Sequence, residues 1–282
     1  DKAITCTATS VQIGTAAVAG NSYSWSPSTG LSNAGIAQPM ATAAGTYRVI
    51  VTVTATGCKD TDEVVVTLNN TLPTANAGND KILTCTAAAV QLDGSSTTSG
   101  VTYGWTGPGI ASGGATATPT VNAPGVYTLT VTNPANGCSA TDQITVNSNT
   151  TLPTADAGTD KVITCTTSSV QIGTAAVAGN SYSWSPTSGL SNAGIAQPTA
   201  TAAGTYTLTV TTTASGCSKT DVVVVPSNTT APSVSTSGAT ICTGQSVQLT
   251  ATGSGATGYS WTGPGIVSGG TTATPTVNAA GT

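Results

Sequence analysis

An internal repeat of about 80 residues runs through the whole chain and sets the size of its folding unit. A cysteine recurs at 79-, 80- and 77-residue intervals, and a tryptophan follows each cysteine at a nearly constant distance. The cysteines are Cys6, Cys85, Cys165 and Cys242, and the tryptophans are Trp25, Trp105, Trp184 and Trp261. Four copies of one unit overrule the two domains that a length of 282 residues would otherwise suggest.

Each of the first three repeats continues with a Gly-x-Tyr segment, a Gly-Cys pair and a Thr-Asp pair that opens an aliphatic run. The tyrosines are Tyr47, Tyr127 and Tyr206, and the second cysteines are Cys58, Cys138 and Cys217. Repeats one and three share one variant sequence, and repeats two and four share another. The expected repeats span 1–71, 72–151, 152–230 and 231–282, with the first cut at its N-terminal side and the fourth at its C-terminal side. We expect them to come from a longer array.

The local pattern predicts an all-β fold. Threonine and valine favour strands, whereas Gly-Asn, Gly-Pro-Gly and Asn-Gly mark turns. In the segment Thr-Tyr-Thr-Leu-Thr-Val at 205–210, Tyr206, Leu208 and Val210 should face a core and the threonines should face outward. About seven such short strands per repeat indicate a β-sandwich. The tryptophans and tyrosines listed above are predicted to be its core residues.

The expected boundaries are short and each carries one proline, at Pro73, Pro153 and Pro232. Proline fixes φ and favours extended structure. These linkers predict stiff joints, and the array is expected to form an extended rod.

Composition excludes several functions. There is no histidine, which excludes a Ser-His-Asp triad, a Cys-His pair and a His-ligated metal. Six basic residues cannot neutralise a run of phosphates, so no nucleic-acid partner is expected. No aliphatic run approaches the roughly 20 residues of a membrane helix, so no membrane span is expected. We therefore predict a protein that is not an enzyme and needs no cofactor.

The cysteines indicate a disulfide framework. The two cysteines of each repeat are 52 or 53 residues apart, and no Cys-x-x-Cys suggests zinc. This spacing predicts one bond within each repeat: Cys6–Cys58, Cys85–Cys138 and Cys165–Cys217, with the partner of Cys242 outside these residues. Paired cysteines predict an oxidising, extracellular location.

Four segments carry a resemblance to a known family. They are Pro-Thr-Ala-Asn-Ala-Gly-Asn-Asp at 73–80, Val-Gln-Leu-Asp-Gly-Ser-Ser at 90–96, Tyr-Gly-Trp at 103–105 and Gly-Val-Tyr-Thr-Leu-Thr-Val-Thr at 125–132. Together they resemble the PKD and immunoglobulin-like repeats of bacterial surface proteins. The added Thr-Cys-Thr and Gly-Cys-x-x-Thr-Asp motifs are most similar to giant cell-surface adhesins of Bacteroidota, which include gliding-motility adhesins. The resemblance implies an extended cell-surface stalk or filament built of β-sandwich domains.

One departure from the PKD pattern affects metal binding. PKD domains usually follow the tryptophan with an acidic Asp-Phe-Gly-Asp-Gly motif, whereas Trp25 is followed here by Ser-Pro and Trp105 by Thr-Gly-Pro. Ca²⁺ at acid-bearing boundaries, near Asp80 or Asp160, remains the cofactor alternative. The third boundary has no acidic residue, so a Ca²⁺ ion at every joint is not expected.

The expected function is mechanical: a non-enzymatic repeat region of an extracellular filament or adhesin stalk. The alternative is an array of carbohydrate-binding or spacer modules on a secreted hydrolase. Expected partners are neighbouring domains and lateral copies of the same chain, with surface glycans bound by regions outside these residues. The segments 26–39 and 106–119, which distinguish the two repeat variants, are predicted to make inter-domain or inter-chain contacts.

Overall fold

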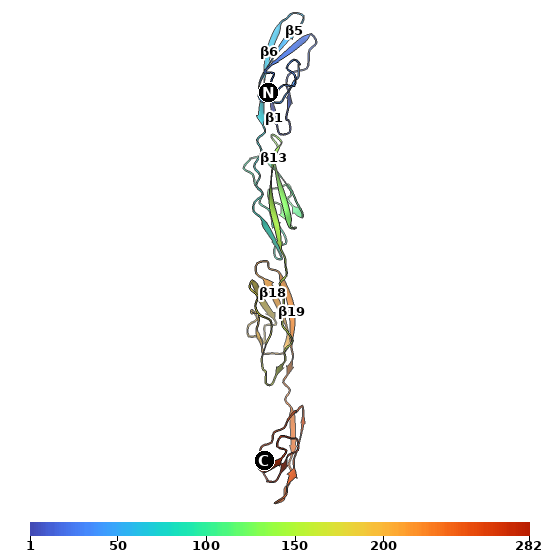
Figure 1. The fold of residues 1–282 in the computed structure, drawn as a ribbon, viewed down its shortest axis with the longest axis vertical. Coiled ribbons are helices and arrows are strands. Elements are labelled where there is room, and N and C mark those ends of the chain that lie inside the picture. The colour runs from blue at the N-terminus through green and yellow to red at the C-terminus, as the bar shows by residue number, and fades with distance from the viewer. The chain divides into compact units, whose positions relative to one another are not determined.

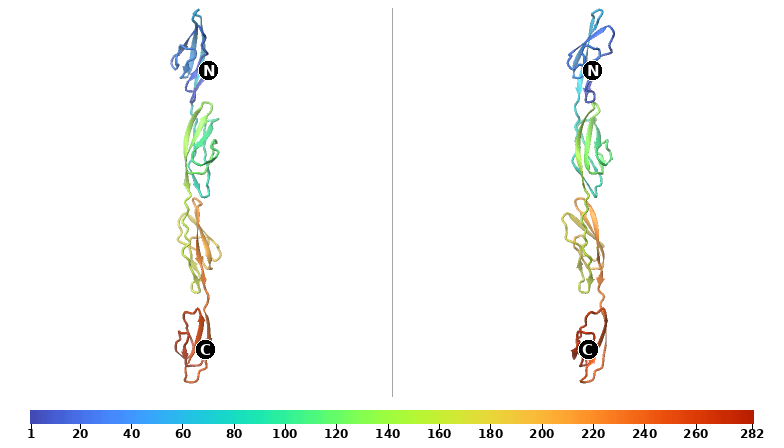
Figure 2. Two further views of the ribbon diagram at one scale, coloured as in Figure 1. Left: turned by 90° about the vertical axis from the view of Figure 1, so that its right-hand side faces the viewer. Right: turned by 45° about the vertical axis from the view of Figure 1, so that its right-hand side comes forward.

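The computed structural model describes residues 1–282, and it contains strands and no helix (Figures 1 and 2). The predicted all-β fold is confirmed. The chain divides into two compact units. The first comprises residues 1–151 together with 215–217, and the second comprises the remaining residues up to 282.

The strands recur in the same order along the chain. The first repeat contains β1 (Lys2–Thr5), β2 (Val11–Gln12), β3 (Asn21–Ser26), β4 (Met40–Ala41), β5 (Gly45–Val53) and β6 (Lys59–Asn69). The second contains β7 (Lys81–Thr84), β8 (Val90–Gln91), β9 (Thr102–Thr106), β10 (Ile110–Ser112), β11 (Thr120–Val121), β12 (Gly125–Asn133) and β13 (Cys138–Asn149).

The third and fourth repeats lie in the second unit, except for residues 215–217. The third contains β14 (Ile163–Thr164), β15 (Val170–Gln171), β16 (Asn180–Ser185), β17 (Thr199–Ala200), β18 (Gly204–Thr212), β19 (Ser218–Val225) and β20 (Ser227–Asn228). The fourth contains β21 (Ser233–Ser237), β22 (Val247–Gln248), β23 (Thr250–Ser254), β24 (Ile266–Ser268) and β25 (Thr276–Val277).

Each of the first two repeats is built on a four-stranded sheet. Its order is β1-β6-β5-β3 in the first repeat and β7-β13-β12-β9 in the second. The short first strand pairs in parallel with the C-terminal part of the long last strand, while the other pairs are antiparallel. A small second sheet, β2-β4 or β10-β11-β8, contains the remaining strands of each repeat. Two sheets in one repeat give the sandwich its two layers.

The core consists of three separate hydrophobic clusters, one within each of the first three repeats. Trp25, Trp105 and Trp184 are buried, and each indole N–H donates to a backbone carbonyl 11 residues later at 2.9–3.1 Å. This hydrogen bond satisfies the only polar atom of the buried side chain.

The three tyrosines are buried in the same clusters. Tyr47 and Tyr206 donate their hydroxyls to the carbonyls four residues upstream, at 2.9 and 2.8 Å. Tyr127 donates to Ala123 at 2.7 Å and also contacts the carbonyl of Pro108. Burial raises the pKa of Tyr127 above its ordinary value, and the hydrogen bond to Ala123 acts in the opposite direction. Each tyrosine therefore holds the turn that precedes its own strand, β5, β12 or β18, against the core.

Strand β18 has the side-chain alternation that its sequence predicts. Tyr206, Leu208 and Val210 are each 1 % exposed, whereas the intervening threonines are half-buried or exposed. Its period of two is the pattern of a strand with one face on the core.

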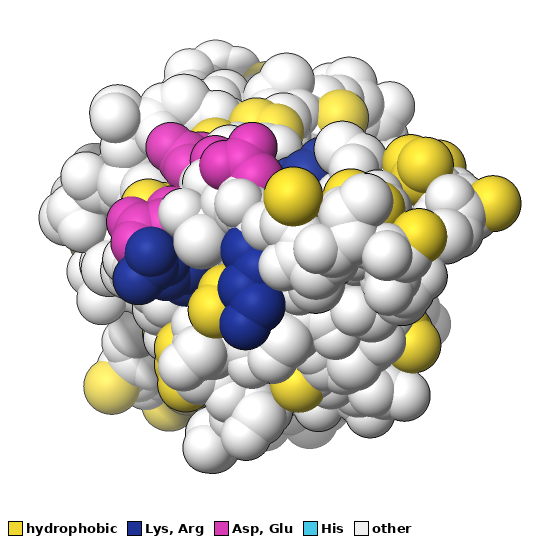
Figure 3. Space-filling view, turned by 90° about the horizontal axis from the view of Figure 1, so that it is seen from above, with side chains coloured by type: hydrophobic (Ala, Val, Ile, Leu, Met, Phe, Trp, Pro, Cys, Tyr) yellow, Lys and Arg dark blue, Asp and Glu magenta, His cyan; other side chains and the backbone are white.

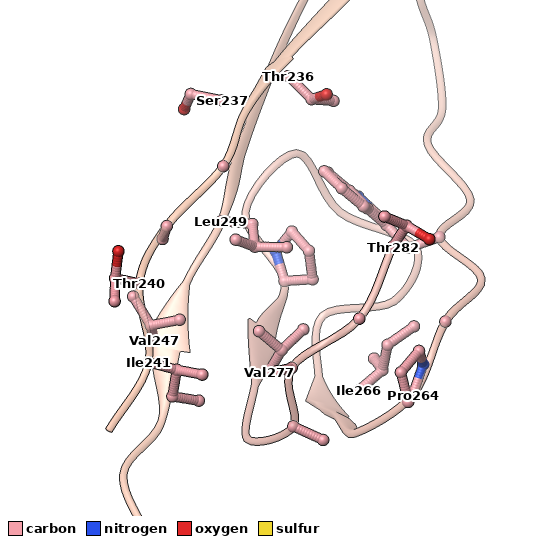
Figure 4. Close-up of a pocket in the computed structure, with 18 of the residues that line it drawn as sticks. Thr236, Ser237, Thr240, Ile241, Val247, Leu249, Pro264, Ile266, Val277 and Thr282 are labelled. Atoms are coloured by element: carbon pink, nitrogen blue, oxygen red, sulfur yellow. The ribbon is translucent and has the colours of Figure 1, made fainter. Parts of the chain in front are cut away.

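The fourth repeat departs from the others, and the prediction that Trp261 is a core residue is wrong for these residues. Trp261 is only half-buried, although its indole N–H still donates to Thr272 at 2.8 Å. Trp261 lines a hollow of about 660 Å³. Figure 4 shows Val247, Leu249 and Val277 among the other side chains that line it.

The surface carries few charges. Only 16 of the 282 side chains are acidic or basic (Asp+Glu 10, Lys+Arg 6). Figure 3 shows only a few charged side chains in view, beside scattered hydrophobic ones. The structure has no helix long and apolar enough to cross a membrane.

The face assignment of β18 and β19 can be tested with two substitutions. Leu208→Ala should destabilise the third repeat by about 2–5 kcal/mol, because it empties a fully buried site. Val224→Ala on β19, at a side chain that is 40 % exposed, should change stability by about 0.5 kcal/mol or less. Hydrogen exchange of the β18 and β19 amides measures both, and equal effects would contradict the assignment.

Candidate functional site: the junctions between repeats

The disulfides join neighbouring repeats, so the predicted bonds within repeats are wrong. Cys6 bonds to Cys138, and Cys85 bonds to Cys217, each across a sequence separation of 132 residues and with Cα atoms 5.0 Å apart. Cys58, Cys165 and Cys242 are free and exposed. The first cysteine of one repeat therefore pairs with the second cysteine of the next.

The parallel pairing of β1 with β6 explains why the two cysteines of one repeat cannot meet. Cys6 directly follows Thr5, which is paired with Asn69 at the end of β6, whereas Cys58 directly precedes the start of β6. An 11-residue strand is roughly 35 Å long at about 3.3 Å per residue. A disulfide needs Cα atoms within about 7 Å, so the two thiols of one repeat lie far beyond bonding distance.

The first junction is formed by the Cys6–Cys138 bond, the hairpin tip at 136–138 and the linker at 69–71. Asn136 is 3 % exposed, and its side-chain amide donates to Asn69 Oδ1 at 3.1 Å and to the Thr71 carbonyl at 3.0 Å. Its Oδ1 accepts from the backbone N–H of Cys138 at 3.0 Å. One buried side chain thus holds both the hairpin tip and the linker, and no buried side-chain polar atom lacks a partner.

Glycine is required at each hairpin tip for two reasons. Gly137 has a φ of 68°, a left-handed conformation that other residues rarely adopt. A Cβ at this position would overlap the side chain of Thr7, which follows Cys6. Gly216 has the same relation to Thr86 at the second junction. Close approach of the hairpin to the Thr-Cys-Thr turn is thus common to both junctions.

The second junction, Cys85–Cys217 with the tip at 215–217, has the same frame with simpler polar contacts. Ser215 replaces Asn136 and is 1 % exposed; its hydroxyl accepts from the Cys217 N–H at 3.4 Å. The Cys217 sulfur lies 3.8 Å from the carbonyl of Asn149, at the end of β13.

In the second and third repeats, the aspartate of the Thr-Asp pair holds the segment that precedes the first strand of the repeat, β7 or β14. Asp142 accepts from the backbone N–H of Ala77 at 2.7 Å, and Asp221 accepts from Ala157 at 2.8 Å. These hydrogen bonds lower the pKa of both carboxyls below the ordinary value, with smaller contributions from the N–H groups of Gln143 and Val222. Asp62 bonds only to the N–H of the next residue and is exposed.

The acids considered for Ca²⁺ have other partners. Asp80 accepts from the N–H of Thr145 on β13 at 2.8 Å, and Asp160 accepts from the N–H of Val224 on β19 at 2.9 Å, so each binds a strand of its own repeat. No three Cys, Asp or Glu side chains gather at a site that could hold a metal ion. Ca²⁺ binding remains an untested expectation, and these contacts give the two acids a structural role.

The segments that distinguish the repeat variants bind the tryptophans of their own repeats through backbone carbonyls. Ile36, in segment 26–39, accepts from the indole of Trp25, and Thr116, in segment 106–119, accepts from Trp105. The junction contacts described above come from hairpin tips and linkers. The predicted inter-domain or inter-chain contacts of these segments remain a prediction.

Comparisons with known proteins identify fold-level similarity alone. No protein-family model matches the chain, and no curated protein matches its sequence. Similar solved structures include an I-band fragment of titin, with 11 % identity, coverage of 80 % of this chain and 94 % of that chain, and a TM-score of 0.39. The three N-terminal domains of the bacteriophage RB49 outer capsid protein Hoc have 14 % identity, coverage of 74 % and 89 %, and a TM-score of 0.35. Immunoglobulin domains 1–5 of Sidekick-1 have 12 % identity, coverage of 88 % and 63 %, and a TM-score of 0.30.

The hairpin contact can be tested with a matched pair of glycine substitutions. Gly137→Ala and Gly57→Ala both replace a glycine of positive φ, which costs roughly 1 kcal/mol or more in each case. Only the Cβ at position 137 meets a neighbouring repeat; nothing lies within 4 Å of one at position 57. Non-reducing peptide mapping should therefore show loss of the Cys6–Cys138 bond in Gly137→Ala alone. Equal bond formation in both variants would contradict the docked hairpin.

The junction carboxylates predict a specific pH dependence. Because the folded-state pKa values of Asp142 and Asp221 lie below the ordinary 3.8, their stabilisation is fully present above about pH 4 and is lost as pH falls through the lowered values. Asp142→Asn together with Asp221→Asn should flatten the acid limb of a stability curve measured between pH 6 and pH 2. Asp62→Asn is the control and should leave that limb unchanged.

Proposed function

We propose that the chain is a non-enzymatic structural repeat region of an extracellular filament or cell-surface adhesin stalk. The observation that carries this proposal is the repeated junction. Two disulfides connect neighbouring repeats with the same cysteine order and the same separation of 132 residues.

A disulfide across a junction gives neighbouring repeats a second covalent connection beside the peptide linker. At the first junction the linker is also held by Asn136, and Pro73 beside it is buried. Two connections at separate points oppose bending more than one linker does. This property suits a stalk or spacer, and supports the extended rod expected from the sequence.

The disulfides also support an extracellular location, because such bonds form and persist in oxidising compartments. The resemblance of the repeats to those of giant Bacteroidota adhesins adds the cell surface and gliding motility to the proposal. Partners in this view are neighbouring repeats and lateral copies of the chain, while surface glycans would be bound by regions outside these residues.

The buried tryptophans weigh against the rival role in carbohydrate binding. Sugar stacking needs an exposed aromatic face, but Trp25, Trp105 and Trp184 are at most 6 % exposed and their indole N–H groups are already bonded. No observation favours a hydrolase-linked binding module over a stalk.

Small-angle X-ray scattering of the oxidised chain tests the proposal. Four repeats end to end, each roughly 35 Å long, would give a rod on the order of 150 Å and a radius of gyration of about 40 Å. A compact protein of 282 residues would have a radius of gyration of about 19 Å. A value near the compact one would refute the stalk.

A further inference from the structure

We propose that the junction disulfides make the chain an extension limiter: under tension, the load bypasses most of the folded residues and follows a short covalent route through the cysteines. This inference deepens the proposed stalk function, since a stalk bears tension. It depends on which cysteines are bonded and where they lie on the strands.

The covalent route follows from the bond pattern alone. From Asp1 the load reaches Cys6 and passes through sulfur to Cys138. It then returns along the second repeat to Cys85 and passes through sulfur to Cys217, from which the chain continues to Thr282. The route contains residues 1–6, 85–138 and 217–282, which are 126 of the 282 residues.

The residues outside this route cannot lengthen the chain. Residues 7–84 lie outside the route and include β2–β6, so the first repeat can unfold without extending the protein. Residues 7–84 and residues 139–216 form two longer connections in parallel with the returning segment. A peptide extends by about 3.5 Å per residue at most, so the oxidised chain should reach about 440 Å and the fully reduced chain about 990 Å.

While it stays folded, the second repeat resists extension at lengths shorter than this maximum. Load enters at Cys138, the first residue of β13, and leaves at Cys85, directly after β7. These two strands run in parallel and pair from Val146↔Lys81 to Asn149↔Thr84. Pulling the start of one strand against the end of the other slides them along their axes. All four register pairs are therefore loaded together and do not open one at a time.

Single-molecule pulling of the full chain between its termini tests the inference. Oxidised wild type should stop at about 440 Å, and addition of a phosphine reductant should release it to about 990 Å. Either Cys138→Ser or Cys217→Ser leaves one bond and a shortest route of about 151 residues, so each should stop at about 530 Å.

The matched control removes the three free cysteines together, as Cys58→Ser, Cys165→Ser and Cys242→Ser. The maximum extension of the oxidised chain should stay at about 440 Å, because none of these three cysteines forms a disulfide of the covalent route. Bonds within repeats would instead leave only Cys85–Cys138 in this variant and allow about 800 Å. That result, or equal oxidised and reduced limits in wild type, would overturn the inference.

The contour length does not depend on how the repeats are arranged in the absence of load. A compact scattering profile together with the short oxidised limit would refute the stalk and leave the covalent route intact. An extended profile together with an oxidised limit as long as the reduced one would refute the limiter and leave the stalk intact.

Discussion

The parallel pairing of the first strand with the last strand is the interaction on which the junctions of this protein depend. In the first two repeats, the first strand pairs over its whole length with the final residues of the last strand. The first cysteine therefore lies where the last strand leaves the domain, beside the linker. The second cysteine lies at the other end of the same strand, where the last hairpin turns. Each of these repeats thus carries one thiol at each end.

This placement changes what the disulfides stabilise. A bond within a single sandwich domain would mainly reduce the conformational entropy of that unfolded domain. The bonds observed close loops that span two repeats, so they couple the repeats to each other, while each core must be stable through its own burial. The Trp, Tyr and aliphatic clusters within the first three repeats provide that burial.

The polar residues at the two hairpin tips differ in the hydrogen bonds that they can make. Asn136 can serve the linker and its own hairpin because an amide both donates and accepts, whereas Ser215 at the equivalent place keeps only the contact within the hairpin. The glycine between each of these residues and its cysteine allows the turn to approach the threonine of the preceding repeat. The Gly-Cys pair is thus a docking element as well as a source of thiol.

The all-β class, the alternation of β18 and the positions of the buried tryptophans and tyrosines in the first three repeats could all be predicted from the amino-acid sequence. These features depend on local periodicity and on side-chain size, which are visible along the chain. The sequence could not determine the cysteine pairing, because a nearly constant spacing fits a bond within a repeat as well as a bond between repeats. The three-dimensional fold distinguishes the two pairings. Parallel register between the first and last strands, which are distant in sequence, places the thiols of one repeat at opposite ends of a long strand and brings those of neighbouring repeats together.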